Sequence, residues 1–265
     1  DVSANYAAAA TLEALGDAGL LARQDILQCA AIIYGCATGG QSAIEAGYVR
    51  MFLDEETNVH PLSIPRFMLN AAVSHISMLF GARGHSVVVS SACSSSAHAI
   101  GEAVYFIRSG RGPVVIAGGG DASLNFGQLI SWRSLQALAP DMCRPFSAGR
   151  SGTVLGEGAA ILILEDEDHA RKRGAKIYSH ITGVGSNADG FHLTRYDPAQ
   201  AAAAIRAAHE DAGLAPKRPL LISTHGTGTV HNDKTEAIAL KLAYPDNLFE
   251  HRAIATKAKI GRAHV

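Results

Sequence analysis

One cysteine stands where a strand is expected to give way to a helix. The stretch VVVSSACSSSAHAI, residues 87–100, runs from three valines through small residues into a helical pattern, and Cys93 falls at the junction. A thiol at the N-terminal end of a helix is favoured as thiolate, the form that attacks a carbonyl carbon. The small neighbours leave room for a substrate, so acyl transfer through sulfur is the chemistry indicated. An inert core cysteine is the alternative interpretation.

A second candidate group lies in LLISTHGTGTVHNDKTE, residues 220–236. An expected strand ends at His225, and a turn rich in glycine and threonine leads to a helix that begins near Asp233. The carboxyl ends of strands are where α/β proteins build sites, so His225 is a candidate there. Thr227 and Thr229 offer hydroxyl groups without adding bulk, and a turn-capping histidine is the alternative.

A third candidate is Lys257, which the pattern AIATKAK places just beyond a short strand. A lysine in that position taken alone is most often a solvated surface charge. A partly buried ion pair with Glu236 or Asp233 would change that interpretation, because a carboxylate would then hold the ammonium group in place.

Other ligand-binding patterns are weaker. His225 and His231 are six apart and have no Cys or acidic companion at ligand spacing, so we predict no metal site. The Gly-rich pieces at 118–121 and 155–160 match neither a dinucleotide fingerprint nor a P-loop, and we expect tight turns there. The chain also has no GxSxG pentapeptide that would supply a serine nucleophile.

The elements that must position these residues alternate between apolar runs and helical patterns. Strands are expected near 29–35, 86–91, 113–117, 159–164, 177–184, 220–224 and 253–256. Helices are expected over 5–18, 64–80, 95–109, 199–212 and 233–243. The order predicts an α/β protein with a mainly parallel sheet covered on both faces, and a long irregular region over 139–158.

Composition sets the broad class. The 265 residues are 48% hydrophobic and 18% charged, with a formal net charge of −1, which is typical of a soluble globular protein. No basic stripe and no run of 18 apolar residues occurs, so we expect neither a nucleic-acid nor a membrane partner. Four cysteines without CxxC spacing favour a reducing, cytoplasmic location.

Taken together and in order, five motifs resemble the β-ketoacyl-acyl-carrier-protein synthases, the elongating condensing enzymes of fatty-acid and polyketide synthesis. The motifs are HPLSIPRFMLNAAVSHISMLFGARG, SSACSSSAHAIGEA, CRPFSAGRSGTVLGEGAAILILE, HGTGTVHND..E and ATKA. The resemblance implies a thiolase-like, layered α/β/α/β/α fold with mixed, mainly parallel sheets. It implies one ketoacyl synthase domain over 1–265, with halves of about 1–165 and 175–259.

The resemblance also assigns roles. Cys93 would carry an acyl chain taken from the phosphopantetheine of acyl carrier protein, and its backbone N–H would form half of an oxyanion hole. His225 would bind the malonyl thioester carbonyl during decarboxylation. Lys257 would be the family lysine, supported by the carboxylates Glu236 and Asp233, and Thr227 and Thr229 would contact the substrate. The enzyme would be a homodimer that uses acyl carrier protein as partner and needs no cofactor of its own.

The chain departs from the family pattern at its end. The second family histidine would fall at Arg262, and arginine cannot act as a neutral imidazole does. The last six residues, IGRAHV, match the translation of a common sequencing adapter, so we expect residues 260–265 to be a non-native tail. We expect a chain truncated at both ends that is poorly soluble or inactive when expressed alone.

Two alternatives from other classes stay open. A non-catalytic partner subunit of the chain-length-factor kind resembles the synthases but usually lacks the cysteine. A cysteine acyltransferase or hydrolase would use Cys93 without decarboxylating malonate.

Overall fold

The computed structural model describes residues 1–55, 57–213 and 220–259. These residues form two compact units, which we describe one at a time. The first unit contains residues 1–127 and 157–180, and the second contains residues 128–156 together with the described residues from 181 onward.

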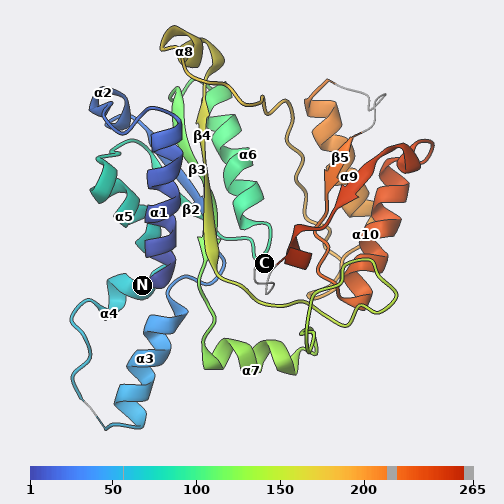
Figure 1. Cartoon of the computed structure of the whole chain (residues 1–265), viewed down its shortest axis with the longest axis horizontal. Helices are drawn as coiled ribbons and strands as arrows, with labels where there is room; N and C mark the ends of the chain where they lie inside the picture. The colour runs from blue at the N-terminus through green and yellow to red at the C-terminus, as the bar shows by residue number, and fades with distance from the viewer. Residues whose placement is uncertain (56, 214–219, 260–265) are drawn as a thin grey trace. The chain divides into compact units, whose positions relative to one another are not determined.

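A four-stranded sheet forms the centre of the first unit (Figure 1). Its strands are β1 (Ala31–Gly35), β2 (Ser86–Val89), β3 (Val114–Asp121) and β4 (Gly158–Glu165). Their order across the sheet is β2-β1-β3-β4; β1 is parallel to both of its neighbours, whereas β4 is antiparallel to β3. The predicted α/β class with a mixed, mainly parallel sheet is confirmed.

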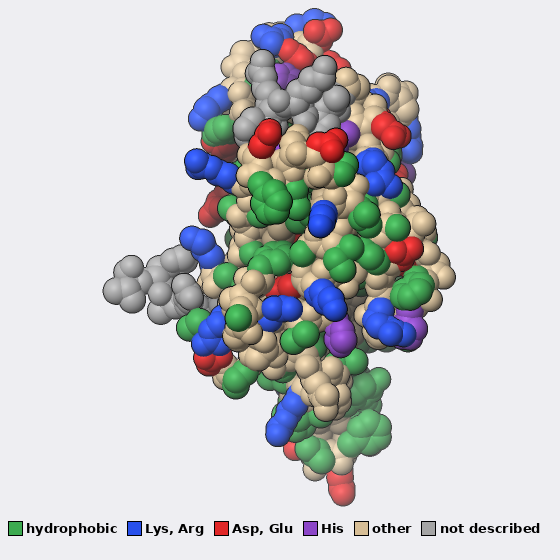
Figure 2. All heavy atoms as spheres, turned by 90° about the vertical axis from the view of Figure 1, so that its right-hand side faces the viewer, with side chains coloured by type: hydrophobic (Ala, Val, Ile, Leu, Met, Phe, Trp, Pro, Cys, Tyr) green, Lys and Arg blue, Asp and Glu red, His purple; other side chains and the backbone are tan. Residues whose placement is uncertain are grey.

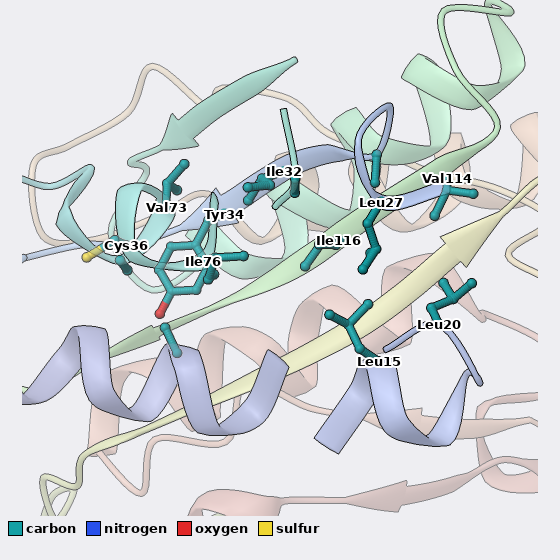
Figure 3. Close-up of a cluster of buried hydrophobic side chains, with 14 residues drawn as sticks. Leu15, Leu20, Leu27, Ile32, Tyr34, Cys36, Val73, Ile76, Val114 and Ile116 are labelled. Atoms are coloured by element: carbon teal, nitrogen blue, oxygen red, sulfur yellow. The ribbon is translucent and has the colours of Figure 1, made fainter. Parts of the chain in front are cut away.

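Both faces of this sheet are covered by helices. The covering helices are α1 (Val2–Asp17), α5 (Ala71–Phe80) and α6 (Ser95–Arg108). Alternate residues of a strand point to opposite faces, so Ile32 and Tyr34 pack with α1 and α5 on one side (Figure 3). Ala31 and Ile33 pack against α6 on the other side. Every residue of β1 is therefore buried, which explains its uninterrupted apolar run.

Four further helices lie in the described part of the first unit. They are α2 (Gln24–Leu27), α3 (Gln41–Phe52), α4 (Ser63–Phe67) and α8 (Glu167–Lys172). One more helix, α7 (Phe126–Ser134), begins in the first unit and ends in the second.

The second unit contains a two-stranded parallel sheet and two long helices. The strands are β5 (Leu221–Ser223) and β6 (Arg252–Ile254), and the helices are α9 (Pro198–Asp211) and α10 (Val230–Ala243), which pack against each other. Two 3-10 turns, η1 (Leu248–Glu250) and η2 (Thr256–Lys259), flank β6. The expected irregular region is also present, because no helix or strand lies within 139–157.

The expected strand over 177–184 is wrong. No strand in the part of the chain that the structure describes pairs with this segment. Its C-terminal part instead runs against α9: a Cβ on Gly183 would lie 2.1 Å from Ala208 O, and Val184 N–H donates to Asp211 Oδ2 at 2.8 Å. The backbone donor is thus satisfied by a side chain, so apolar alternation here reflects packing on a helix rather than a ladder.

The single helix expected over 64–80 is two helices, α4 and α5. Met68 adopts an extended conformation with ψ 142°, which ends α4, and α5 begins at Ala71. Apolar residues keep the helical spacing across this break, so the sequence pattern does not reveal it. Helix α3 was not predicted at all, because none of its residues is buried and no core-facing period marks it.

The surface carries both signs of charge. Lys and Arg side chains are scattered over the face shown in Figure 2, with Asp and Glu between them. Within the described ranges, no helix has the length and apolar character needed to cross a membrane.

Candidate active site

Cys93 lies on the turn that joins β2 to α6, and we call residues 90–94 the Cys93 turn. Helix α6 begins at Ser95 with Ser94 as its N-cap residue, so Cys93 precedes the helix by two positions. The helix predicted over 95–109 begins at the same residue as α6, and Cys93 lies before it rather than in its first turn. Cys93 is exposed and free, as an attacking thiol must be.

Side chains from the start of α6 reach back to fix this turn. Ser95 Oγ accepts the Ser91 N–H at 2.9 Å and donates to Ala92 O at 2.6 Å. Ser94 Oγ donates to Ser91 O at 2.7 Å, and Ser91 Oγ shares a 2.6 Å hydrogen bond with His98 Nδ1. These bonds join the strand side of the turn to its helix side.

The backbone of the turn is unusual and closely packed. Ala92 has φ +53°, a left-handed conformation that non-glycine residues seldom adopt. Beneath it, a Cβ on Gly35 would lie 2.4 Å from the carbonyl carbon of Ser95, and one on Gly119 would lie 2.4 Å from Ser96 Oγ. The two glycines therefore let the start of α6 approach the ends of β1 and β3.

The buried cysteines differ from Cys93. Burial, and next the carboxylate of Asp121, raise the pKa of Cys36 to about 11, so this thiol stays protonated. Burial also raises the pKa of Cys143. Cys29 is exposed but lies away from any helix start, between α2 and β1. Cys93 is thus the cysteine in this chain with both access and a helix start behind it.

The His225 loop, residues 225–229, follows β5 and leads into α10. Gly226 and Gly228 have φ +46° and +73°, so both adopt left-handed backbone. A Cβ on Gly228 would lie 2.7 Å from Gly152 O and 2.8 Å from Cys143 Sγ. The HGTGT pattern therefore provides glycine where side chains would be strained and crowded.

Lys257 contacts His225 directly. Its Nζ donates to His225 O at 2.6 Å and lies 3.3 Å from His225 Nδ1. An ammonium group has only donors, so Nδ1 must accept and the proton of the neutral ring lies on Nε2. Desolvation by surrounding protein, and next the Lys257 charge, lower the pKa of His225, although the residue as a whole is exposed. At neutral pH the ring is an uncharged donor.

The two carboxylates hold the backbone of the loop. Glu236 accepts the N–H groups of His225 at 2.6 Å and Gly226 at 2.9 Å. Asp233, which is 2% exposed, accepts the N–H groups of Gly228 at 3.1 Å and Phe146 at 2.7 Å. Among the described residues no ion pair joins either carboxylate to Lys257, so their support is exerted through the loop.

The two threonines are neighbours on the loop. Thr227 Oγ1 and Thr229 Oγ1 share a hydrogen bond of 2.8 Å. Behind them, the Cys143 thiol donates to Thr227 O at 3.2 Å. The hydroxyl pair is half-buried, so it can bind a substrate polar group by exchanging one hydrogen bond for another.

Two residues of this network were not singled out from the sequence. Asn232 Nδ2 donates to Asp233 Oδ1 at 3.1 Å and to Glu236 Oε2 at 3.4 Å, and Tyr196 OH donates to Asn232 Oδ1 at 3.1 Å. Asn232 lies inside the HGTGTVHND motif and could have been chosen from it. Tyr196 lies 36 positions earlier and carries no local signal.

The structure thus brings together the six predicted residues of the second unit, namely His225, Lys257, Thr227, Thr229, Asp233 and Glu236. Cys93 belongs to the first unit. No group of three His, Cys, Asp or Glu side chains within the described ranges could hold a metal ion. Arg262 and the expected tail, residues 260–265, lie outside the described residues.

The chain is similar to known proteins over nearly its whole length. One curated relative is nodulation protein E of Rhizobium leguminosarum bv. trifolii, 39% identical over 249 residues, covering 94% of this chain and 62% of the relative. Another is 3-oxoacyl-[acyl-carrier-protein] synthase 2 of Coxiella burnetii, 31% identical over 269 residues, covering 98% and 65%. The chain therefore spans about three fifths of the length of the curated relatives it matches.

The fold is also that of solved ketosynthases, with TM-scores of 0.86 to 0.89, which confirms the predicted thiolase-like architecture. One is described as a type II PKS acyl-carrier protein in complex with its ketosynthase; it has a TM-score of 0.87 and 27% identity over 97% of this chain and 66% of that one. Family models match residues 1–170 as the β-ketoacyl synthase N-terminal domain and 178–265 as the C-terminal domain. By sequence and by fold, the chain belongs to the β-ketoacyl synthase family.

Proposed function

We propose that the protein catalyses decarboxylative condensation of an acyl thioester with a malonyl thioester, as a step of fatty-acid or polyketide elongation. The observation that supports this most strongly is the state of His225. Lys257 occupies Nδ1, and a lowered pKa keeps the ring neutral, so Nε2–H is available as a donor at neutral pH. Such a donor stabilises negative charge that develops on an oxygen atom.

In the first step Cys93 takes up the acyl chain. Its thiolate attacks the carbonyl carbon of an acyl group carried on the phosphopantetheine of acyl carrier protein. The tetrahedral intermediate collapses, the carrier thiol leaves and takes up a proton, and a new thioester forms on Cys93. Cys93 is exposed on the turn before α6, so a carried thioester can reach its sulfur.

In the second step the malonyl thioester loses carbon dioxide. The electron pair of the broken C–C bond moves onto the thioester oxygen as an enolate, and His225 Nε2–H donates to that oxygen. The enolate carbon then attacks the acyl carbonyl on Cys93, and the Cys93 thiolate leaves. The charge exists only after decarboxylation begins, so a donor aimed at it lowers the barrier.

The other predicted residues have positioning or binding roles in this scheme. Lys257 fixes the tautomer of His225, Glu236 and Asp233 hold its loop, and the hydroxyls of Thr227 and Thr229 bind the carrier arm or malonyl group. All the chemistry uses side chains of the protein and carried substrates, so we propose that no further cofactor takes part.

A second copy of the chain is the partner we propose for the edge of the first unit. β2 is an outer strand of the sheet, so one side of its backbone has no ladder partner among the described residues. Grooves of about 550 Å³ and 350 Å³ flank it, and Val87 and Val88 line both. Val88→Lys tests this: we expect a shift from dimer to monomer in light scattering, and an unchanged mass would contradict it.

The function is tested with acyl and malonyl carrier proteins, using the chain or a longer version of it. We expect the acyl mass to appear on Cys93 and a β-ketoacyl product to follow. Free acid instead of that product would indicate a cysteine hydrolase or acyltransferase. Neither acylation nor product, with the protein folded, would indicate the non-catalytic partner subunit.

A further inference from the structure

The side-chain amide of Asn232 lies between the two carboxylates that hold the His225 loop. Its Nδ2 donates to Asp233 Oδ1 at 3.1 Å and to Glu236 Oε2 at 3.4 Å. Only one orientation of the amide allows this, because the reverse would turn Oδ1 toward two carboxylates, an acceptor facing acceptors. The orientation of one amide therefore decides whether the two carboxylates keep its N–H groups in addition to the backbone donors that they already accept.

Tyr196 stabilises that orientation from outside the loop. Its OH lies 3.1 Å from Asn232 Oδ1 and 3.4 Å from Asn232 O, and in both contacts the phenol is the donor. Burial, and next the charges of Glu236 and Asp233, raise the pKa of Tyr196, so its proton stays in place. A phenol that always donates requires an acceptor, and the amide oxygen is that acceptor.

Tyr196 is itself held in place. The next residue, Asp197, is the N-cap of α9: its side chain accepts the Ala199 N–H at 2.8 Å, and Pro198 follows at the first helical position. The Asp197 N–H donates to Asp189 Oδ2 at 3.0 Å. Helix α9 packs against α10, which carries Asn232. The position of the phenol is therefore fixed by contacts other than its hydrogen bond to the amide.

We propose that Tyr196 is a positioning residue for the decarboxylation step. The Tyr196 phenol donates to the Asn232 amide, and the amide donates to Glu236. Glu236 in turn accepts the backbone N–H of His225. This inference rests on the proposed function, because it assigns the network to the step that uses the His225 ring. The proposal predicts different effects on the two half-reactions, because decarboxylation uses the His225 N–H donor and acylation of Cys93 does not.

The test is Tyr196→Phe, which removes one hydroxyl and preserves the ring. We expect carbon dioxide release from malonyl carrier protein to slow by about three- to tenfold, the effect of one hydrogen bond. Acylation of Cys93 is expected to stay within about twofold of the unchanged protein. Equal slowing of both half-reactions, or of neither, would overturn the proposal.

The matched control is Tyr244→Phe. Tyr244 is 5% exposed, and its OH shares a 2.8 Å hydrogen bond with His209, so it loses a comparable bond at the far end of α10. It contacts neither carboxylate, and we expect no selective loss of carbon dioxide release. The same selective loss in Tyr244→Phe would assign the effect to general loosening of the unit and would overturn the role of Tyr196.

A second variant and a second measurement keep the test independent of turnover. Asn232→Asp replaces the donor with a third carboxylate, and we expect a larger selective loss, about 100-fold. The imidazole signals of His225 in NMR are expected to move in Tyr196→Phe and to stay in place in Tyr244→Phe. If the unchanged protein forms no product, the proposed function fails, and the NMR comparison still decides whether Tyr196 positions His225.

Discussion

The Cys93 turn and the His225 loop are held by different means. Hydroxyl groups and one imidazole from neighbouring residues fix the first, and all of them lie within residues 91–98. Carboxylates and an ammonium group 5 to 32 positions away fix the second. Hydrogen bonds to charged groups are roughly twice as strong as neutral ones. The position of the proposed nucleophile therefore depends on local backbone shape, whereas the position of the histidine depends on charged groups that are distant in the sequence.

The largest effect is expected where the chemistry itself is removed. Cys93→Ala leaves no atom to carry the acyl group, so acylation and product formation are expected to fall on the order of 1,000-fold or more. Mass spectrometry of the protein after exposure to acyl carrier protein checks this. Cys29→Ala, which removes the other exposed thiol, is the control and is expected to acylate normally.

The second-largest effect is expected when the buried charge of Asp233 is removed from the network that holds the His225 loop. Asp233→Asn places an amide N–H₂ where a buried carboxylate now accepts from Gly228 and Phe146, so at least one backbone N–H loses its acceptor. We expect about 3 kcal/mol of lost unfolding free energy in urea denaturation. Asp189→Asn is the matched control, because Asp189 also accepts two backbone N–H groups but is only half-buried. Equal losses would show that burial of the charge is irrelevant.

Lys257→Met tests how the ammonium group sets the state of His225. Activity that needs the neutral ring has its full value at pH values above the His225 pKa, and it falls as the pH drops through that pKa. Removing the Lys257 charge raises that lowered pKa, so the loss begins at a higher pH. We also expect about a tenfold lower rate at neutral pH, because the tautomer loses its partner. A pH profile that does not move would refute this account of the ring.

The smallest effect is expected in the Cys93 turn. Ser95→Ala removes a hydroxyl that accepts from Ser91 and donates to Ala92, and we expect about 1 kcal/mol lower stability. Iodoacetamide modification of Cys93 should slow by a few-fold, because the backbone is less fixed. Ser134→Ala, which loses a hydroxyl bond to a helix carbonyl at an exposed site, is the control. If Ser95→Ala matched Asp233→Asn in cost, the contrast between the two regions would be wrong.

The same contrast explains what the sequence could predict. The strand, turn and helix around Cys93 are consecutive, so an apolar run followed by small residues was enough to locate them; the helix begins where it was predicted, and the strand ends two positions earlier than predicted. The five ordered motifs predicted the family and its fold. The contact of Lys257 with His225 joins residues 32 apart, and that of Asp233 with Phe146 joins residues 87 apart. No local pattern records such pairings.

The errors have physical causes of the same kind. The pattern over 177–184 was interpreted as a strand, but its glycine at position 183 fits against α9, a partner that periodicity cannot identify. Helix α3 buries no residue, so nothing in its sequence distinguishes one face from another. Tyr196 was missed because its significance lies in the amide it meets, not in its neighbours.

The burial of two of the four thiols has a consequence for oxidative chemistry. Cys36 and Cys143 are covered and their pKa values are raised, so peroxide, which reacts with thiolates, attacks them slowly. Cys93 is exposed, so peroxide can reach its sulfur and convert it to a sulfenic acid. A sulfenate cannot accept an acyl group, and a reducing thiol restores it. Catalytic capacity would therefore track the redox balance of its surroundings while the fold stayed intact.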